Sequence, residues 1–406
     1  MNIIIIGGLG YDYIKPEKWL PRHVDNHYYF VVKAHHFDEF QRHLSERTDI
    51  ELVKINDWYN SNQIEQFIFD FSQTRKIDRL VSLREEEVIR ISQAREFLNI
   101  SGLRPSSAVL FRDKHEMKKL MRKNGIKVAE DSKVDSFFEA LNFIAKTHSK
   151  YPYILKPIDG ASSRDTFVIK NLSSLEQLDY KYFERAIMET FVPGDVYHID
   201  ALYTQGQLRY MSAAKYIHIP IAFQRGKSTA SMFLQSDSEE SQEMLSFGKK
   251  VCMLMPLPEN CIIHLETFKN KKGIYFNEIA VRFGGGKILD TIDREFDFNL
   301  LGEYLKAESG VPFEHKGILK WEKPRGFLLV TPQKGELSYM PEKVPGDDID
   351  LYEVYAKVGN QYNMGQNSVQ ALASVEVHAD DNESLQRRIL GLEEWFLKSV
   401  KYKNNL

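Results

Sequence analysis

The first hundred residues alternate between short apolar runs and amphipathic segments. Residues 3–6 are all isoleucine, as in a parallel strand that is buried on both faces. Further strands are predicted at residues 30–32 and 51–55, and apolar side chains at i, i+3 and i+4 spacing predict a helix over residues 85–98. Strand alternating with helix indicates an open parallel α/β layer.

The rest of the chain divides at two places. A stretch rich in serine, glycine and proline at residues 101–110 marks a boundary, and Asp113 with Glu116 three residues later predicts the capped start of a helix. Elements of α+β type are expected to continue to about residue 310. A lobe follows that ends in an amphipathic helix over residues 383–400. We therefore expect three domains, at residues 1–105, 106–310 and 311–406.

Composition narrows the class of protein. The 406 residues contain 54 Lys and Arg against 57 Asp and Glu, a net charge of −3, so the chain as a whole does not attract nucleic acid or an anionic membrane. Its two cysteines, Cys252 and Cys261, exclude a disulfide framework and a cysteine-rich zinc module. Because there is no basic leader and no run of about 18 apolar residues, we expect a soluble cytoplasmic protein.

A predicted hairpin carries the first candidate for chemistry. An apolar strand ends in Lys156, a turn of small residues follows at 160–166, and a second strand is predicted at residues 167–169. In such a hairpin, backbone amides and the hydroxyls of Ser162 and Ser163 can donate hydrogen bonds to phosphate oxygens, while Lys156 supplies positive charge. An ordinary hairpin with an exposed lysine would show the same pattern.

The second candidate is an apolar strand over residues 187–192 that runs into the turn Pro193-Gly194. Backbone N–H and C=O groups at such a strand end can bind an adenine ring, with Glu189 beside its amino group. A strand that merely ends at a turn is the alternative interpretation.

The third candidate is a pair of carboxylates. Glu266 and Glu278 stand on strands that flank a turn at residues 270–273. Two carboxylates facing each other across a hairpin repel unless a cation lies between them, and paired oxygen ligands suit Mg²⁺. His264 beside Glu266 resembles half of a zinc site, but no third ligand stands at the spacing of such a site.

The fourth candidate is Arg282, four residues after Glu278 and followed by three glycines at 284–286. A cation beside bare backbone amides can approach a developing oxyanion. The alternative is a flexible linker, although three successive glycines are entropically unfavourable to order.

Taken in order, these features resemble the ATP-grasp superfamily. Lys156, the serine-bearing turn, Glu189, the two glutamates and Arg282 follow the order of the family's motifs, and Asp113-Lys114 matches the start of the helix that enters its nucleotide domain. The resemblance spans about residues 75–310 and is closest to the branch of biotin carboxylase, carbamoyl-phosphate synthetase and the L-amino acid ligases. It implies an ATP-grasp fold with α/β and α+β parts. Residues 1–105 would be the pre-ATP-grasp domain, 106–310 the nucleotide-binding domain in two subdomains hinged near 189–194, and 311–406 a C-terminal lobe.

The resemblance also assigns roles. It implies ATP and two Mg²⁺ ions as cofactors, with Mn²⁺ as an alternative ion. The implied catalytic residues are Arg282, at the reacting acyl phosphate, and Lys156. The implied nucleotide contacts are Lys114, Lys156, Gly160, Ser162, Ser163, Glu189, Phe191 and Val192, and the implied metal ligands are Glu266 and Glu278.

Two positions depart from the family pattern. Val196 stands where the family often has a glutamate on the ribose, and Asp195 or His198 is expected to take that role. Ala280 stands where an asparagine often follows the second metal ligand, so one ligand is lost or is replaced by water.

The resemblance implies an ADP-forming ligase that joins a carboxylate, an amino acid in the L-amino acid ligase type, to an amine through an acyl phosphate. Its partners would be small-molecule carboxylates and amines, without nucleic acid or membrane, and a homodimer is compatible with the sequence. Two alternatives stay open. One is a biotin carboxylase-like enzyme that forms carboxyphosphate, for which the lobe after residue 310 is short; the other is an ATP-binding protein without turnover, which Val196 and Ala280 favour.

Overall fold

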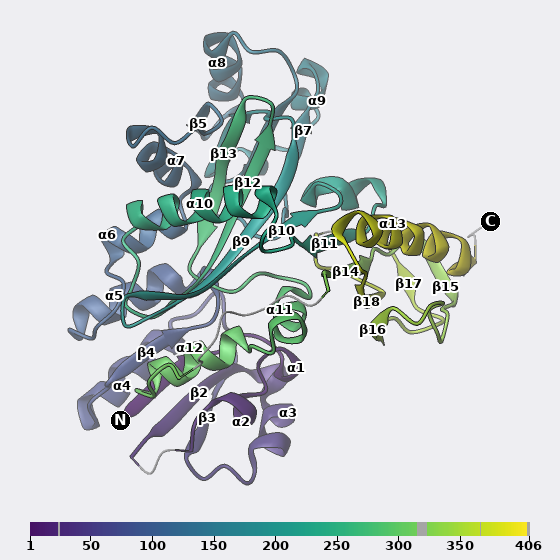
Figure 1. Cartoon of the computed structure of the whole chain (residues 1–406). Coiled ribbons are helices and arrows are strands. Elements are labelled where there is room, and N and C mark those ends of the chain that lie inside the picture. The colour runs from purple at the N-terminus through teal and green to yellow at the C-terminus, as the bar shows by residue number, and fades with distance from the viewer. Residues whose placement is uncertain (23–24, 315–322, 366, 404–406) are drawn as a thin grey trace.

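A computed structural model describes residues 1–22, 25–314, 323–365 and 367–403 (Figure 1). The N-terminal domain, lowest in Figure 1, is built on a four-stranded parallel sheet in the order β3-β2-β1-β4. Its strands are β1 (Asn2–Ile6), β2 (His27–Lys33), β3 (Ile50–Ile55) and β4 (Arg79–Ser82). Residues 3–6 are all buried, so the predicted parallel α/β layer is confirmed.

Helices cover both faces of this sheet. Alternate residues of β1 pack into different cores: Ile3 and Ile5 face the side of α1 and α3, whereas Ile4 and Ile6 face α4 and α5. The helices are α1 (Tyr11–Ile14), α2 (Pro16–Trp19), α3 (Ala34–Leu44), α4 (Gln63–Thr74) and α5 (Val88–Phe97).

The helix predicted over residues 85–98 is shorter than expected. Its first turn, Glu85–Glu87, is a 3₁₀ turn that precedes α5. The carboxylate of Glu87 accepts hydrogen bonds from the Trp58 indole at 2.6 Å and from Arg90 at 3.2 Å. These side-chain contacts fix the turn. Glu85, its first residue, extends toward the part of the chain after residue 105.

A small antiparallel sheet in the order β5-β8-β6-β7 forms the upper part of the molecule in Figure 1. Its strands are β5 (Asp131–Val134), β6 (Tyr153–Pro157), β7 (Phe167–Ile169) and β8 (Ala186–Thr190), and the nearby helices are α6 (Pro105–Ala108), α7 (Lys114–Lys123), α8 (Phe137–Thr147) and α9 (Leu172–Glu176). The predicted cap of α7 is confirmed in part. Asp113 accepts from the amides of His115 and Glu116, both at 3.0 Å. The Asp113 amide, however, donates to Val109 rather than to Glu116. The side chain of Glu116 therefore does not accept a hydrogen bond from the capping residue in return.

The largest sheet has eight strands in the order β13-β12-β9-β10-β11-β14-β18-β16. Its bounds are β9 (Asp195–Thr204), β10 (Gln207–Tyr216), β11 (Thr229–Phe233), β12 (Cys261–Asn270), β13 (Gly273–Ala280), β14 (Arg325–Val330), β16 (Ile349–Val354) and β18 (Ala373–His378), with α10 (Glu239–Leu254) against β9 and β10. Because β11 pairs with β14, this sheet runs without a break from the central region into the C-terminal lobe.

The C-terminal lobe, on the right of Figure 1, adds α13 (Asn382–Ser399) and a three-stranded sheet. The strands of that sheet are β15 (Gly335–Tyr339), β17 (Gln361–Tyr362) and β19 (Lys401–Lys403). The terminal helix matches its prediction within one residue at each end. Asp381 caps it by accepting from the Ser384 amide at 2.7 Å.

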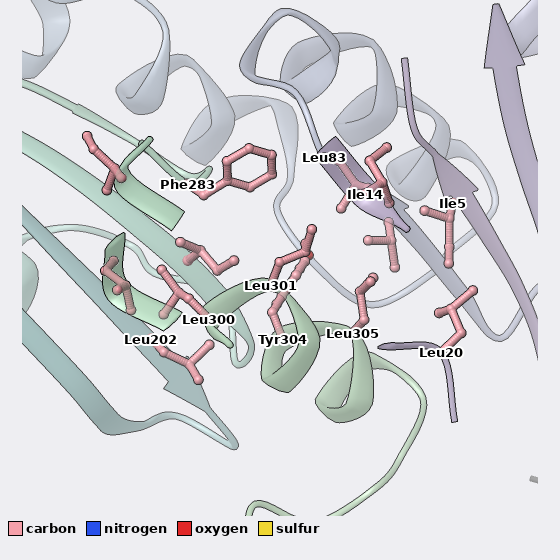
Figure 2. Packing of buried hydrophobic residues seen from close by; sticks show 14 of the residues in the cluster. Ile5, Ile14, Leu20, Leu83, Leu202, Phe283, Leu300, Leu301, Tyr304 and Leu305 are labelled. Carbon is pink, nitrogen blue, oxygen red and sulfur yellow. The ribbon is translucent and has the colours of Figure 1, made fainter. Parts of the chain in front are cut away.

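Two helices join the N-terminal domain to the large sheet: α11 (Ile288–Phe296) and α12 (Leu300–Glu308). Figure 2 shows α12 between two walls, with Leu202 and Phe283 on one side and Ile5, Ile14 and Leu20 on the other. One continuous hydrophobic cluster therefore joins these domains. Among the described residues, no helix combines the length and the apolar character needed to cross a membrane.

Candidate active site

A cavity of about 900 Å³ lies between the small sheet and the hairpin of β12 and β13. It brings together most of the residues that the sequence singled out. Its lining includes Lys114, Lys156, Gly160, Ser162, Ser163, Glu189, Phe191, Val192, Glu266 and Glu278.

The floor of this cavity is a buried cluster of charges. Glu189 on β8 is 3.0 Å from the Nζ of Lys118 and 3.1 Å from the Nζ of Lys156. Burial alone would raise the pKa of Glu189, but the two ammonium groups outweigh it and lower the pKa. Burial alone would likewise lower the pKa of Lys156, yet Glu189, Glu278 and Glu266 raise it. Lys156 therefore stays positively charged at neutral pH.

The hinge that follows β8 requires a glycine. Phe191 and Val192 line the cavity there, and the chain turns at Pro193-Gly194 before entering β9. Gly194 has φ of +147°, and a Cβ at this position would lie 2.3 Å from the carbonyl oxygen of Lys269 on β12. Only glycine lets the hinge lie this close to the neighbouring strand.

The two carboxylates face each other as predicted. Glu266 and Glu278 are register partners across the antiparallel pair β12 and β13, so their side chains lie on one face of the sheet. Glu278 pairs with the Nζ of Lys114 at 3.2 Å. Burial would raise its pKa, but Lys114, Lys156 and Lys118 outweigh that effect and bring it to about 2.

This donor set fits a magnesium ion. Glu278 is ionised at neutral pH, and the side chain of Asn277 donates to Glu266 at 3.1 Å, which fixes one of its oxygens. Carboxylate oxygens on one face beside a cavity are ligands that Mg²⁺ prefers, and the ion keeps its remaining positions for water and phosphate.

The serine turn at residues 160–166 lies over the cavity. Ser162 and Ser163 both adopt the left-handed region, with φ of 55° and 54°, a conformation that is uncommon outside glycine. Contacts from other parts of the chain hold the turn. The carbonyl of Ser162 accepts from the Ser368 amide at 3.2 Å, and Gln224 donates to the carbonyl of Thr166 at 2.8 Å.

Arg282 lines a second, smaller cavity of about 260 Å³. Its guanidinium donates to Glu85 at 3.1 Å, and Arg112 donates to the other oxygen of the same carboxylate at 2.8 Å. Burial would lower the pKa of Arg282, but Glu85 and two further glutamates raise it. Lys114 and Glu278 line both cavities, so the two spaces meet at that ion pair.

The glycines after Arg282 serve packing. A Cβ at Gly284 would lie 2.6 Å from Ile288 and 3.0 Å from His264, and one at Gly286 would lie 3.0 Å from Leu329. None of the three glycines lines either of these cavities.

The two residues expected at the ribose lie elsewhere. Asp195 is exposed and pairs with Lys215 at 2.7 Å, and neither it nor His198 lines the large cavity, whereas Val196 does. His198 is fully buried, with Nδ1 2.6 Å from Asp200, which is also 2.8 Å from Nδ1 of His264. These three side chains form a compact group. Their short contacts are hydrogen bonds, and a metal ion would need the ligand atoms further apart.

Sequence reasoning missed Lys118, Asn277 and Arg112. Lys118 is fully buried, and its Nζ donates to the backbone carbonyl of Asn277 at 2.6 Å. Its one signal is position, because it follows Lys114 by one helical turn and shares a helix face with it. Arg112 gave no signal, since its partners Glu85 and Asp159 are distant in the sequence. Asn277 stands beside Glu278 on the predicted hairpin, and its contact with Glu266 was overlooked.

Comparison with known proteins agrees with this geometry. The ATP-grasp domain family matches residues 111–286. The L-arginine-specific L-amino acid ligase of Bacillus subtilis is 24% identical over 344 residues, which are 76% of this chain and 81% of that protein.

Solved structures share the fold over nearly the whole chain. The L-amino acid ligase of Bacillus licheniformis matches with a TM-score of 0.73 at 16% identity, over 99% of both chains. The biotin carboxylase domain of the Hydrogenobacter thermophilus 2-oxoglutarate carboxylase, solved with magnesium ADP and bicarbonate, matches with a TM-score of 0.65 at 14% identity, over 98% of this chain and 90% of that one. Residues 111–286 thus match the ATP-grasp domain family, and the chain as a whole shares the fold of these ligases.

Proposed function

We propose that this protein is an ADP-forming ligase that joins the carboxylate of an amino acid to an amine. The observation that carries the proposal is the shared wall of the two cavities, Lys114 and Glu278. The smaller cavity also contains Arg112 and Arg282. A carboxylate bound there would lie among three cations, beside a phosphate held at Lys114.

The large cavity is the proposed ATP site. The adenine would lie at the hinge, against Phe191 and Val192, and the triphosphate would extend toward Lys114 and Lys156. Both lysines are at least nine-tenths buried, so their charges would act on phosphate oxygens with little screening by water.

The metal ligands proposed are Glu266 and Glu278. Bound Mg²⁺ would neutralise charge on the phosphate oxygens of ATP during phosphoryl transfer. The low pKa of Glu278 keeps this carboxylate ionised whether or not the ion is bound.

The proposed reaction has two steps. A carboxylate oxygen attacks the γ-phosphorus, the bond to the bridging oxygen breaks, and ADP leaves; the amine nitrogen then attacks the acyl carbon and phosphate leaves. Arg282, held by Glu85, would orient the carboxylate and stabilise charge that develops on its oxygens. The turn at residues 160–166 would cover the phosphates and exclude water, which otherwise hydrolyses the acyl phosphate.

An amino acid is proposed as the carboxylate because the relative from Bacillus subtilis is an L-amino acid ligase. That relative is specific for L-arginine, so arginine is the first amino acid to test. Carboxyphosphate formation from bicarbonate is the second candidate. A cavity of about 260 Å³ with three cations suits bicarbonate as well as an α-carboxylate, and a neighbouring fold was solved with that anion.

Phosphate release from ATP and Mg²⁺ tests the proposal. Arginine, pools of the other amino acids, and bicarbonate are added in separate arms, each with and without a second amine. We expect release that depends on an amino acid and rises with the amine. Release with bicarbonate alone would support the second candidate, and ATP binding without release in every arm would favour a protein that binds ATP without turnover.

A further inference from the structure

We propose that a third cavity binds a small zwitterion, a molecule that carries both a carboxylate and an ammonium group, such as a free amino acid or a short peptide. The cavity has a volume of about 640 Å³ and lies between the N-terminal domain, the start of β12 and the end of α12. It shares no lining residue with the two cavities of the active site. The third cavity is therefore separate from the site proposed for the ligase reaction.

The charges that line this cavity balance. Arg79 and Arg95 contribute two positive charges, and Glu259 and Glu308 contribute two negative ones. A net charge near zero, with both signs present, selects a ligand that carries both signs rather than a simple anion or cation.

Arg79 and Glu308, which face each other in this cavity, do not form a close ion pair. The Nε of Arg79 is 3.9 Å from the carboxylate of Glu308, too far for a hydrogen bond. This Nε is buried and has no hydrogen-bond partner among the described residues. The Nε atom itself is enclosed, but the Arg79 side chain is 32% exposed, so a ligand carboxylate would accept from the terminal nitrogens of its guanidinium. The ligand's ammonium group would then pair with Glu308.

The surroundings hold these groups in place. Arg95 donates twice to the carbonyl of Leu80, from Nε at 3.1 Å and from Nη2 at 2.5 Å. A Cβ at Gly102 would lie 2.8 Å from the Nε of Arg95, so this loop position has to be glycine for the arginine to fit. Burial raises the pKa of Glu308, and the two arginines oppose that effect. A ligand ammonium group would oppose it further.

The cavity also touches segments that lead to the active site. Val281, which lines it, directly precedes Arg282, and Val88 lies three residues after Glu85. Glu85 and Arg282 form the ion pair of the smaller active-site cavity. An occupant of the third cavity would contact both segments that carry this pair, which makes the cavity suited to a regulatory ligand.

Binding measured without nucleotide tests the proposal. The probes are the 20 common amino acids and alanyl-alanine, screened by thermal shift on the full chain, and the strongest are then titrated by calorimetry. We expect Arg79→Gln and Glu308→Gln each to weaken binding at this site by about tenfold or more. Lys76→Gln, which removes a mostly exposed lysine near Arg79, is the matched control and should leave the affinity unchanged.

Two further arms make the result decisive. Probes that lack one charge, N-acetyl-alanine and alanine amide, should bind at least about tenfold more weakly than alanine itself if alanine binds. A preference for alanyl-alanine over every free amino acid would identify a peptide as the ligand. The proposal is overturned if no probe binds, or if binding is the same in Arg79→Gln and Glu308→Gln as in Lys76→Gln. Equal binding in the three variants would mean that amino acids bind only at the active site.

Discussion

Two groups of buried carboxylates in this molecule behave in opposite ways. In the large cavity, Glu189 and Glu278 have lowered pKa values, and that of Glu278 falls to about 2. Where α11 packs against β14 and β18 of the large sheet, burial raises the pKa values of Glu295 and Glu376 to about 7. Glu189, Glu295 and Glu376 are buried, and the Glu278 side chain is 27% exposed. Because the buried Glu189 has a lowered pKa and the buried Glu376 a raised one, burial alone does not explain the difference.

The number of nearby cations explains why the two groups have opposite pKa shifts. Three buried lysines, Lys114, Lys118 and Lys156, surround the first pair. Glu376 has one close cation, Arg294, at 2.8 Å, and that arginine is 41% exposed. Neither oxygen of Glu376 accepts a hydrogen bond within the part of the chain that the structure describes. The first group therefore holds fixed negative charge at neutral pH, as a metal site requires, whereas the second takes up protons.

The largest expected effect is on activity. Glu278→Ala removes a proposed metal ligand and the partner of Lys114, so we expect substrate-dependent phosphate release to fall by about 100-fold or more. The control is Glu243→Ala, which removes a half-exposed carboxylate on α10 that pairs with Lys269 on β12. Turnover in Glu278→Ala close to that of Glu243→Ala would contradict the metal assignment, provided that circular dichroism shows both variants folded.

The next effect is on stability. Lys118→Met leaves Glu189 with one lysine instead of two, so we expect the free energy of unfolding in urea to fall by about 3 kcal/mol, since a broken buried ion pair is strongly destabilising. Lys119→Ala, an exposed lysine on the same helix, should change it by less than about 0.5 kcal/mol.

A double variant sharpens this prediction. Adding Glu189→Leu to Lys118→Met removes the uncompensated charge, and we expect it to recover part of the lost stability. If the double variant is as unstable as the sum of both single variants, the two side chains act independently and the buried charge cluster is wrongly described.

Local sequence patterns singled out most of the residues discussed here that line the large cavity. The turn at residues 270–273 is short, so the hairpin itself follows from the sequence. Its register alone would pair Glu266 with Asn277, and a register shift between Glu266 and Thr267 brings Glu278 opposite Glu266 instead. Lys156 and the hinge were found in the same way, because strand and turn signals lie within a few residues of the chemistry. The buried parallel strand at residues 3–6 could also be predicted, because it is a continuous apolar run.

Contacts between distant segments were not predictable. Lys118 reaches Asn277 across 159 residues, and Arg282 reaches Glu85 across 197. The pairing of β11 with β14 carries the large sheet into the C-terminal lobe, and no local signal announces it. The expectation for Asp195 illustrates strand alternation: Val196 faces the cavity, so its neighbour Asp195 points to the other face.

A smaller effect is expected on nucleotide affinity. Lys156→Ala removes one of the cations proposed for the phosphates, and it also leaves Glu189 paired only with Lys118. We expect the Kd for ATP, measured by calorimetry, to rise about 10- to 30-fold, the usual range for one charge-assisted hydrogen bond. Lys150→Ala, an exposed lysine before β6, is the control. An unchanged Kd in Lys156→Ala would remove this lysine from the phosphate site.

The smallest effect is the pH dependence of stability, which tests the other half of the comparison. The pKa of Glu376 rises from 4.5 to about 7 on folding, so the folded chain keeps a proton that the unfolded chain releases. Its contribution to stability is complete below pH 4.5 and is lost as the pH rises to about 7. In Glu376→Gln the group no longer ionises. The variant should therefore gain about 1 to 2 kcal/mol relative to the parent between pH 5 and pH 6.5, measured by urea unfolding.

The opposite slope belongs to the large cavity. Because the pKa of Glu278 falls from 4.5 to about 2, the stability that it contributes is present above pH 4.5 and is lost only as the pH falls toward 2. Unfolding curves of Glu278→Gln and the parent should therefore run parallel between pH 5 and pH 8, where those of Glu376→Gln and the parent diverge. Parallel curves for both variants would mean that Glu376 is ionised in the folded chain, and that Arg294 alone compensates its charge.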